Sequence, residues 1–422
     1  MRARVLKRTG ALGAGTIAGG LLAYVFFAMA TRALGARDAA PVSVLWTYWT
    51  MVAAILTFPL QHWTIRLITQ RAEGTLARSR RRIWVGTVVL SAVSGLVAYL
   101  ARGVLFHDPT VVYPAMVAGI TAGATFSGSV RGGLAGRGRY AATGMSMAAD
   151  NLVRVVLGAA VVLSGGGAKA FGLALVLGPL SGFLWPSSLR YHDRDSGGTE
   201  LISSPLALAS GVAAGSLIAQ VVLTGGPVAV AALGGAPQQV TALFVTMAVW
   251  RGPYLIALGM APQLTPALTR MALADDRRRL RSVRRWILTA VAGLAVVAFI
   301  AGATVVEPGL RTVFGPDVVL PWRTAALIGV GTTVAVGNLG LLLLMLACGT
   351  SRPLNWGWLT AVVVGAALLL TLPLEPLDRV VTAFVVAQVT AFAWMLAAPL
   401  RELRATDTQE MGDFTGEGPP GM

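Results

Sequence analysis

Cysteine, histidine and acidic residues are all scarce in this chain. Its 422 residues include one cysteine, Cys348, three histidines and 18 aspartates and glutamates. A single cysteine allows neither an internal disulfide nor a zinc cluster, and the histidines lack the spacing of metal ligands. Since the sequence shows no cluster of acids, histidines and nucleophiles, we expect a protein that is not an enzyme and that holds no metal and no cofactor.

Charged residues of either sign make up only 12% of the chain, whereas hydrophobic residues make up 55% and the mean hydropathy is +0.70. The apolar residues form about twelve runs of roughly 20 residues, the length that crosses a bilayer as a helix. The sequence therefore predicts an all-α polytopic membrane protein. The predicted spans are 11–33, 43–65, 83–105, 111–131, 141–163, 168–187, 205–225, 239–260, 286–306, 322–347, 354–372 and 378–399.

The basic residues fall mainly into alternate loops between these spans. With the N-terminus inside, the cytoplasmic segments hold 25 of the 34 lysines and arginines, Arg131 among them, and the opposite loops hold seven. Such an excess marks cytoplasmic loops, so we expect both termini in the cytoplasm. Loops that face anionic headgroups explain the net charge of +16, and we expect membrane lipids, not nucleic acid, as partners.

The chain divides into two halves of six spans each. The polar segment Tyr191–Glu200 separates them, so we predict an N-lobe over residues 1–200 and a C-lobe over residues 201–403. The tail over residues 404–422 contains acids, glycines and prolines and too few apolar residues to bury a core. We therefore expect it to be a disordered cytoplasmic segment.

Similar motifs recur in the two halves at an offset of about 200 residues. The matches are Ala33-Leu34-Gly35 with Ala232-Leu233-Gly234, Pro59 with Pro262, and the basic loops before Trp84 and Trp286. Because six spans is an even number, both halves enter the membrane in the same sense, and such parallel repeats hold substrate at the repeat interface in transporters. Losing the first span as a signal peptide would unpair the halves, so we expect it to be retained.

Ala30–Gly35 closes the first predicted span, and Val313–Asp317 lies between spans 9 and 10. These segments resemble the A-R-x-L-G turn that ends the first helix, and the L-F-G-x-x element, of the polysaccharide-exporter, or Wzx-like flippase, branch of the multidrug/oligosaccharidyl-lipid/polysaccharide (MOP) exporter superfamily. Val130–Leu134 with Gly138–Tyr140 resembles its R-G-x-L-Q-G-x-x-R-F turn without the glutamine. The acidic-basic motif of the major facilitator family is absent between spans 2 and 3.

The resemblance implies a V-shaped pair of helical lobes around a central cavity that opens to one side at a time. It also implies movement of undecaprenyl-pyrophosphate-linked glycans across a bacterial cytoplasmic membrane, with glycosyltransferases or polymerases as partners. An ion-coupled multidrug exporter of the same superfamily is the first alternative. A non-transporting membrane scaffold or an enzyme acting on a lipid carrier is the second.

Two arginines lie within predicted spans, where charges are costly and usually functional. Arg154 follows Asp150 and Asn151 by four and three residues, so the three share one helix face. This spacing fits either an ion pair between Asp150 and Arg154 or a substrate site in which Arg154 and Asn151 bind and Asp150 carries a coupling ion. Arg251 precedes Gly252-Pro253, a step expected to disturb the helix. We predict that Arg251 binds substrate; pairing with Asp150 or with carbonyls is the alternative.

Arg32 and Asn338 complete the predicted substrate-binding residues. Arg32 lies near the outer interface, where a snorkelling anchor explains it equally well. Asn338 lies in a glycine-rich run and is expected to face the cavity more than Gln220 or Gln388. Six tryptophans near span ends predict an interfacial belt: Trp46, Trp49, Trp84, Trp286, Trp322 and Trp356. Tyr48 and Trp49 could instead stack on sugars.

Overall fold

Helices joined by turns form nearly all of the described structure. The computed structural model describes residues 2–191, 212–274, 276–348 and 352–398, and these ranges contain no strand. Nine helices in them are long and apolar enough to cross a membrane. One further long helix and two segments built from shorter helices raise the number of spans to the predicted twelve. The predicted junction at Tyr191–Glu200 and the tail at 404–422 lie almost wholly outside the described residues.

The N-terminal half contains six membrane-spanning segments. They are α1 (Arg2–Asp38); α2 (Ala40–Val52), η1 (Ala53–Thr57) and α3 (Phe58–Thr69) in one line; α4 (Glu73–Leu100); α6 (Val112–Gly136); α7 (Tyr140–Leu163); and α8 (Ala168–Leu177) with η2 (Gly178–Leu184). Two short helices, α5 (Arg102–Leu105) and η3 (Pro186–Leu189), lie between or after them.

The C-terminal half has the same number of segments. They are α10 (Val212–Thr224) with α11 (Gly226–Ala232); α12 (Pro237–Leu273); α13 (Arg277–Ala301), η4 (Gly302–Val306) and α14 (Glu307–Phe314) in one line; α15 (Trp322–Ala347); α16 (Arg352–Thr371); and α17 (Pro376–Ala397).

Two prolines explain the two widened turns inside these helices. The π-helical segments η1 and η4 end at Thr57 and Val306, two residues before Pro59 and Pro308 respectively. Proline has no N–H and its ring clashes with the carbonyl four residues earlier. A wider turn relieves that clash and lets the helix continue.

Equivalent glycines turn the chain after the first segment of each half. Gly35 kinks α1 near its end with φ of 73°, and Gly234 lies between α11 and α12 with φ of 77°. A residue with a side chain rarely adopts this left-handed conformation. Both glycines end the repeated Ala-Leu-Gly motif, so the sequence repeat corresponds to a repeated backbone turn. This agrees with two parallel six-helix halves.

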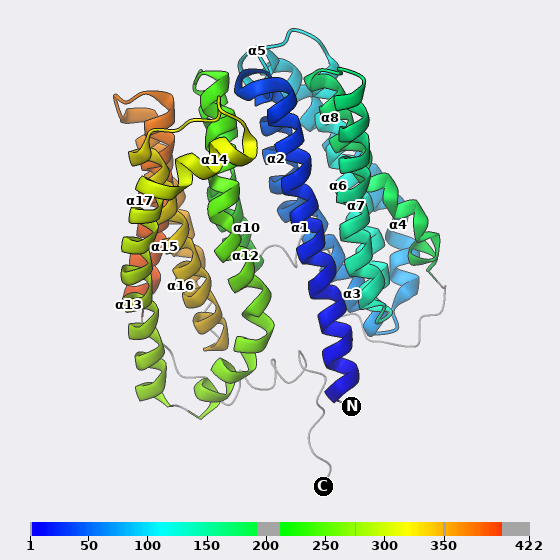
Figure 1. The fold of residues 1–422 in the computed structure, drawn as a ribbon. Coiled ribbons are helices and arrows are strands. Elements are labelled where there is room, and N and C mark those ends of the chain that lie inside the picture. Colours follow the sequence, from blue (N-terminus) through cyan, green and yellow to red (C-terminus); the bar gives the residue numbers. More distant parts are fainter. Residues whose placement is uncertain (1, 192–211, 275, 349–351, 399–422) are drawn as a thin grey trace.

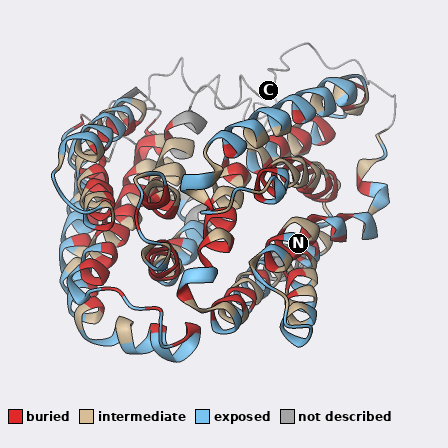
Figure 2. Cartoon of the chain, turned by 90° about the horizontal axis from the view of Figure 1, so that it is seen from above, coloured by how far each residue is buried: buried red, intermediate tan, exposed pale blue. Residues whose placement is uncertain are grey.

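Figure 1 shows the two halves as separate bundles, with α1 and α12 facing each other between them. We call the end that holds α5 and α14 the upper end, and the end that holds the N-terminus the lower end. In Figure 2 the buried residues lie within each bundle, and exposed residues cover much of the outside. Many of the exposed residues are large and apolar, such as Leu163 (88% exposed) and Leu370 (82%), as a surface that faces lipid tails requires.

Small residues allow α1 to lie directly against α7. A Cβ atom placed on Gly15 would be 2.4 Å from the backbone carbonyl carbon of Gly144, and one on Gly19 would be 3.2 Å from the carbonyl oxygen of Met147. Such close approach is typical of helix pairs in membranes. Gly15 and Gly19 therefore form a small-residue packing motif between α1 and α7.

We expect Gly15→Val to destabilise the N-terminal half by about 1–3 kcal/mol, the usual cost of overpacking. The valine would push α1 away from α7. Gly13→Val is the matched control, because a Cβ at Gly13 meets nothing within 4 Å. Thermal unfolding of the purified variants in detergent measures the difference. Equal melting temperatures for the two variants would contradict the packing described here.

Candidate functional site

Asp150 forms an ion pair within the N-terminal half, but its partner is Arg131. The Arg131 guanidinium on α6 donates to Asp150 Oδ2 at 2.7 Å, and Ser181 Oγ on η2 donates to Oδ1 at 3.1 Å. Of the two alternatives that the spacing left open, the ion pair between Asp150 and Arg154 is not formed here. Arg131, which was expected at the end of a span and counted with the cytoplasmic segments, lies within α6 with 8% of its surface exposed. The pair joins α6, α7 and η2.

Arg154 is fully buried beside this pair. Its Nη1 donates to Asn151 Oδ1 at 3.0 Å and its Nε donates to the carbonyl oxygen of Leu175 at 3.3 Å. Its Nη2 has no acceptor among the described residues. Gly178 leaves the necessary space, since a Cβ there would lie 2.4 Å from Arg154 Nε. Arg154 and Asn151 thus meet each other, inside the helix bundle.

Two tryptophans from α2 cover the Arg154 guanidinium. Its central carbon lies 4.4 Å from the Trp49 ring centroid and 5.5 Å from that of Trp46, distances that allow cation–π attraction. Trp46 is 7% exposed. These two residues therefore do not belong to the expected interfacial belt, although Trp84, Trp286, Trp322 and Trp356 are exposed as a belt requires.

A second polar group lies where the two halves meet. The Tyr24 hydroxyl on α1 donates to the carbonyl oxygen of Ala248 on α12. Nearby, Gln220 Nε2 on α10 donates to the Tyr254 hydroxyl at 2.8 Å. Both phenols lie near enough to Arg251 to act electrostatically on its guanidinium. We call Tyr24, Gln220, Arg251 and Tyr254 the junction cluster.

Arg251 has fewer partners than the other buried arginines. It is partly buried, its Nε has no acceptor among the described residues, and no carboxylate in that part of the chain pairs with it. Asp150, the alternative partner, is held by Arg131. The expected interruption at Gly252-Pro253 does not occur, because α12 is one continuous helix from Pro237 to Leu273. Pro253 still leaves one carbonyl of α12 without its helical donor.

The halves contact each other from the junction cluster to the upper end. The rings of Phe27 and Phe244 lie 4.4 Å apart, and Ser43 Oγ donates to Thr241 Oγ1 at 3.3 Å. Below the cluster, α1 and α12 diverge (Figure 1), and large apolar residues there are exposed, including Ile17 (67%) and Ile256 (68%).

Asn338 lies inside the C-terminal half and does not face the junction. It is 3% exposed, and its Nδ2 donates to Gln388 Oε1 at 2.8 Å and to the Gln388 carbonyl oxygen at 3.1 Å. Polar bonds of this kind join neighbouring helices in membranes. The expectation that Asn338 faces a cavity is thus wrong; the residue joins α15 to α17.

Arg32 connects the halves at the upper end. It is exposed on α1, and its Nε donates to the carbonyl oxygen of Val313 at 2.8 Å while Nη2 donates to that of Thr312. These are among the last carbonyls of α14, which carry a partial negative charge. Arg32 is therefore more than a snorkelling anchor, since it holds α1 to α14 across the two halves.

We expect Arg32→Ala to loosen the upper end. A cation at a helix C-terminus contributes about 1 kcal/mol, so separation of α1 from α14 should become about fivefold more frequent. Hydrogen–deuterium exchange at residues 310–318 measures this opening. Arg37→Ala removes the same charge from the same end of α1 and should leave the exchange rates unchanged. Equal acceleration in both variants would show that net charge, not this contact, governs the opening.

Sequence reasoning missed Arg131, Ser181 and Tyr24 as members of these sites. Arg131 was placed at a span end, and neither a serine nor a tyrosine is unusual enough to stand out in an apolar run. Trp46 and Trp49 are three residues apart and so share one helix face. This spacing could have indicated that both rings cover the same group, which is the Arg154 guanidinium. Within the described residues, no group of three or more histidines, cysteines and acids could hold a metal ion.

The fold and its buried charges define a polytopic helical membrane protein built from two six-helix halves. No protein-family model and no curated protein sequence matches the chain, whereas solved structures match nearly all of it. A lipid II flippase MurJ in an inward closed conformation has a TM-score of 0.65 at 11% identity, with 91% of this chain and 86% of that chain covered.

Two structures of multidrug resistance MATE family transporters of the MOP superfamily also match. The inward-facing conformation has a TM-score of 0.59 at 15% identity and covers 89% of this chain and 93% of that one. The outward-facing conformation has a TM-score of 0.52 at 17% identity and covers 92% and 94%. The chain therefore has the fold of MOP superfamily transporters.

Proposed function

We propose that this protein is an alternating-access flippase that moves a lipid-linked oligosaccharide or polysaccharide precursor across a bacterial cytoplasmic membrane. The observation that carries the proposal is the junction cluster, in which Arg251 of α12 lies near Tyr24 of the other half and has no carboxylate partner among the described residues. A cation in this position suits a pyrophosphate linkage. The likeness of the fold to a lipid II flippase supports the same class of substrate.

The charges inside the membrane favour this reading over the export of cationic drugs. Among the described carboxylates, only Asp150 lies more than two helical turns away from both ends of its membrane-spanning segment. Arg131 pairs with it. A cation exporter would need a free acid where substrate binds. Asp150 remains the proposed carrier of a coupling ion, because its protonation would release Arg131.

The proposed cycle uses the contacts between the halves. With the positive-inside orientation, the diverging lower end faces the cytoplasm and receives the substrate headgroup at Arg251. Arg32 and the contact between Phe27 and Phe244 then separate as the upper end opens to the other leaflet. The same proposal includes glycosyltransferases or polymerases as partners that supply the lipid-linked glycan before this step and use it afterwards.

Reconstitution in liposomes tests the proposal. A fluorescent undecaprenyl-pyrophosphate oligosaccharide is placed in both leaflets, and loss of fluorescence to a membrane-impermeant quencher measures its exchange. We expect protein-dependent quenching beyond the outer-leaflet half, faster than in protein-free liposomes. Absence of exchange for several glycans, together with proton-driven efflux of ethidium by the same liposomes, would assign the protein to the multidrug alternative.

A further inference from the structure

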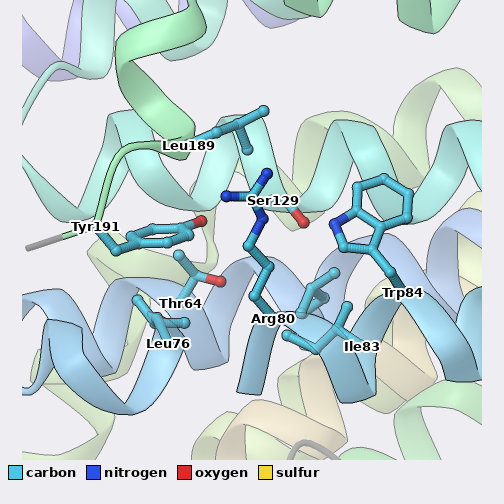
Figure 3. Close-up of a pocket in the computed structure, with 9 residues that line it drawn as sticks. Thr64, Leu76, Arg80, Ile83, Trp84, Ser129, Leu189 and Tyr191 are labelled. Atoms are coloured by element: carbon cyan, nitrogen blue, oxygen red, sulfur yellow. The ribbon is translucent and has the colours of Figure 1, made fainter. Parts of the chain in front are cut away.

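A recess lies at the lower end of the N-terminal half, away from the junction cluster. It is formed by α3, the first turns of α4, α6, η3 and the residues that follow η3, and it opens to solvent, with which it encloses about 460 Å³ of space. Figure 3 shows Arg80 reaching from α4 into the centre of the recess. Neither the junction cluster nor the buried ion pair uses any residue that lines it.

The wall of the recess is firmly built. Leu60 and Leu76 are 8% and 2% exposed and belong to a small apolar core of α3 and α4. Thr64 beside them is 1% exposed. The recess is thus a depression in packed structure, and the Arg80 side chain extends over it from a rigid helix.

Hydrogen-bond donors converge inside the recess. The indole nitrogen of Trp84 and the hydroxyl of Tyr191 both face the guanidinium of Arg80 (Figure 3). Guanidinium and indole groups can donate but cannot accept. Burial raises the pKa of the Tyr191 phenol above its ordinary value, so that group also keeps its proton. The Tyr191 hydroxyl can donate as well as accept, so an acceptor placed between these three groups could receive a hydrogen bond from each of them.

The charge inside the recess is positive. None of its nine lining residues is acidic, and Arg80 forms no ion pair among the described residues. The acid that acts on Tyr191 from nearby is Glu73, and Arg137 holds it at 3.3 Å. An anion is therefore the group that fits, and a phosphate matches the fork of a guanidinium.

The position along α4 identifies the source of that anion. Four arginines between Arg78 and Arg82 precede Trp84, and three valines that follow it are exposed: Val85 (55%), Val88 (66%) and Val89 (56%). Basic residues followed by tryptophan and then by exposed valines mark the boundary between headgroups and hydrocarbon. Acyl chains can therefore lie along α4 while their headgroup occupies the recess.

We propose that this recess binds the phosphate headgroup of an anionic glycerophospholipid, with Arg80, Trp84 and Tyr191 as donors and the exposed valines of α4 along its acyl chains. Basic pockets between membrane helices are known to hold anionic headgroups. The site is separate from the junction cluster, so its occupation is measured by binding and does not depend on transport.

Native mass spectrometry of the purified protein in neutral detergent tests this site. Phosphatidylglycerol is titrated, with phosphatidylcholine of the same acyl chains and inorganic phosphate as separate arms. We expect one tight phosphatidylglycerol site that Arg80→Gln weakens about tenfold or more, the scale of one charge-assisted bond. Trp84→Phe should weaken it less, and phosphatidylcholine binding should not change. Arg81→Gln removes the same charge from the same turn outside the recess and should have no effect.

Two results would overturn the proposal. Equal weakening by Arg80→Gln and Arg81→Gln would show diffuse attraction to a basic helix end. Displacement of phosphatidylglycerol by equimolar inorganic phosphate would assign the recess to a free anion. Melting temperatures are compared first; if Arg80→Gln fails to fold, then Arg80→Lys and Trp84→Phe carry the comparison with Arg81→Gln.

Discussion

Arg251→Gln is expected to abolish flipping of the lipid-linked oligosaccharide while the protein stays folded. The glutamine keeps most of the side-chain length but removes the charge that we propose to bind the pyrophosphate. Truncating one member of a desolvated charge pair costs about 2–5 kcal/mol, so the apparent affinity for substrate should fall about 30-fold or more. The liposome exchange assay, run over a range of lipid-linked oligosaccharide concentrations, measures the change.

Stability should separate Arg251 from Arg154. No described carboxylate depends on Arg251, so the melting temperature of Arg251→Gln should match that of the parent. Arg154 is fully buried and donates hydrogen bonds to Asn151 and Leu175. Arg154→Gln should therefore lower the melting temperature, and its main effect should be on stability and not on the affinity for substrate. Normal flipping by well-folded Arg251→Gln would contradict the assignment of the junction cluster as the substrate site.

Arg131→Ala is expected to destabilise the protein by about 3–5 kcal/mol, because it leaves the buried Asp150 carboxylate without its cation. Ser181 would remain as its donor. Asp150→Asn in the same chain should recover much of that loss, since the amide carries no charge. Thermal unfolding in detergent, followed through a double-mutant cycle, gives the coupling energy between the two positions.

A second cycle between Asp150 and Arg154 is the control for this result. These residues lie on the same face of α7, but the structure pairs Asp150 with α6 and Arg154 with Asn151. The Asp150–Arg154 coupling should therefore be well below that of Asp150 with Arg131. A larger coupling for Asp150 with Arg154 would favour the ion pair that the sequence spacing left open and would contradict the structure.

Nine of the spans followed from the sequence because their apolar runs are long enough to cross a membrane as helices. The predicted span 322–347 coincides with α15, and 141–163 differs from α7 by one residue. The repeated Ala-Leu-Gly motif also carried structural information, because a left-handed turn after the first segment requires glycine in each half. These features depend on local chemistry that the residues themselves display.

Partner choice could not be predicted in the same way. Helical spacing brings Asp150 and Arg154 to one face, but it cannot show that Arg131 approaches from another helix. Asn338 and Arg251 are both polar residues in apolar runs, yet Asn338 donates to Gln388 inside the C-terminal half whereas Arg251 lies near Tyr24 of the other half. Such outcomes depend on how helices distant in sequence pack together.

The central claim is that the two halves rock about the junction cluster, and distances between spin labels test it most directly. Cys348 is first replaced by serine, and cysteines are then introduced in pairs at Arg37 and Val319 near the upper end and at Ile17 and Ile256 below the cluster. We predict two distance populations for each pair, shifted in opposite directions when lipid-linked oligosaccharide is added. A single unchanged distance for both pairs, in protein that binds the oligosaccharide, would contradict the account.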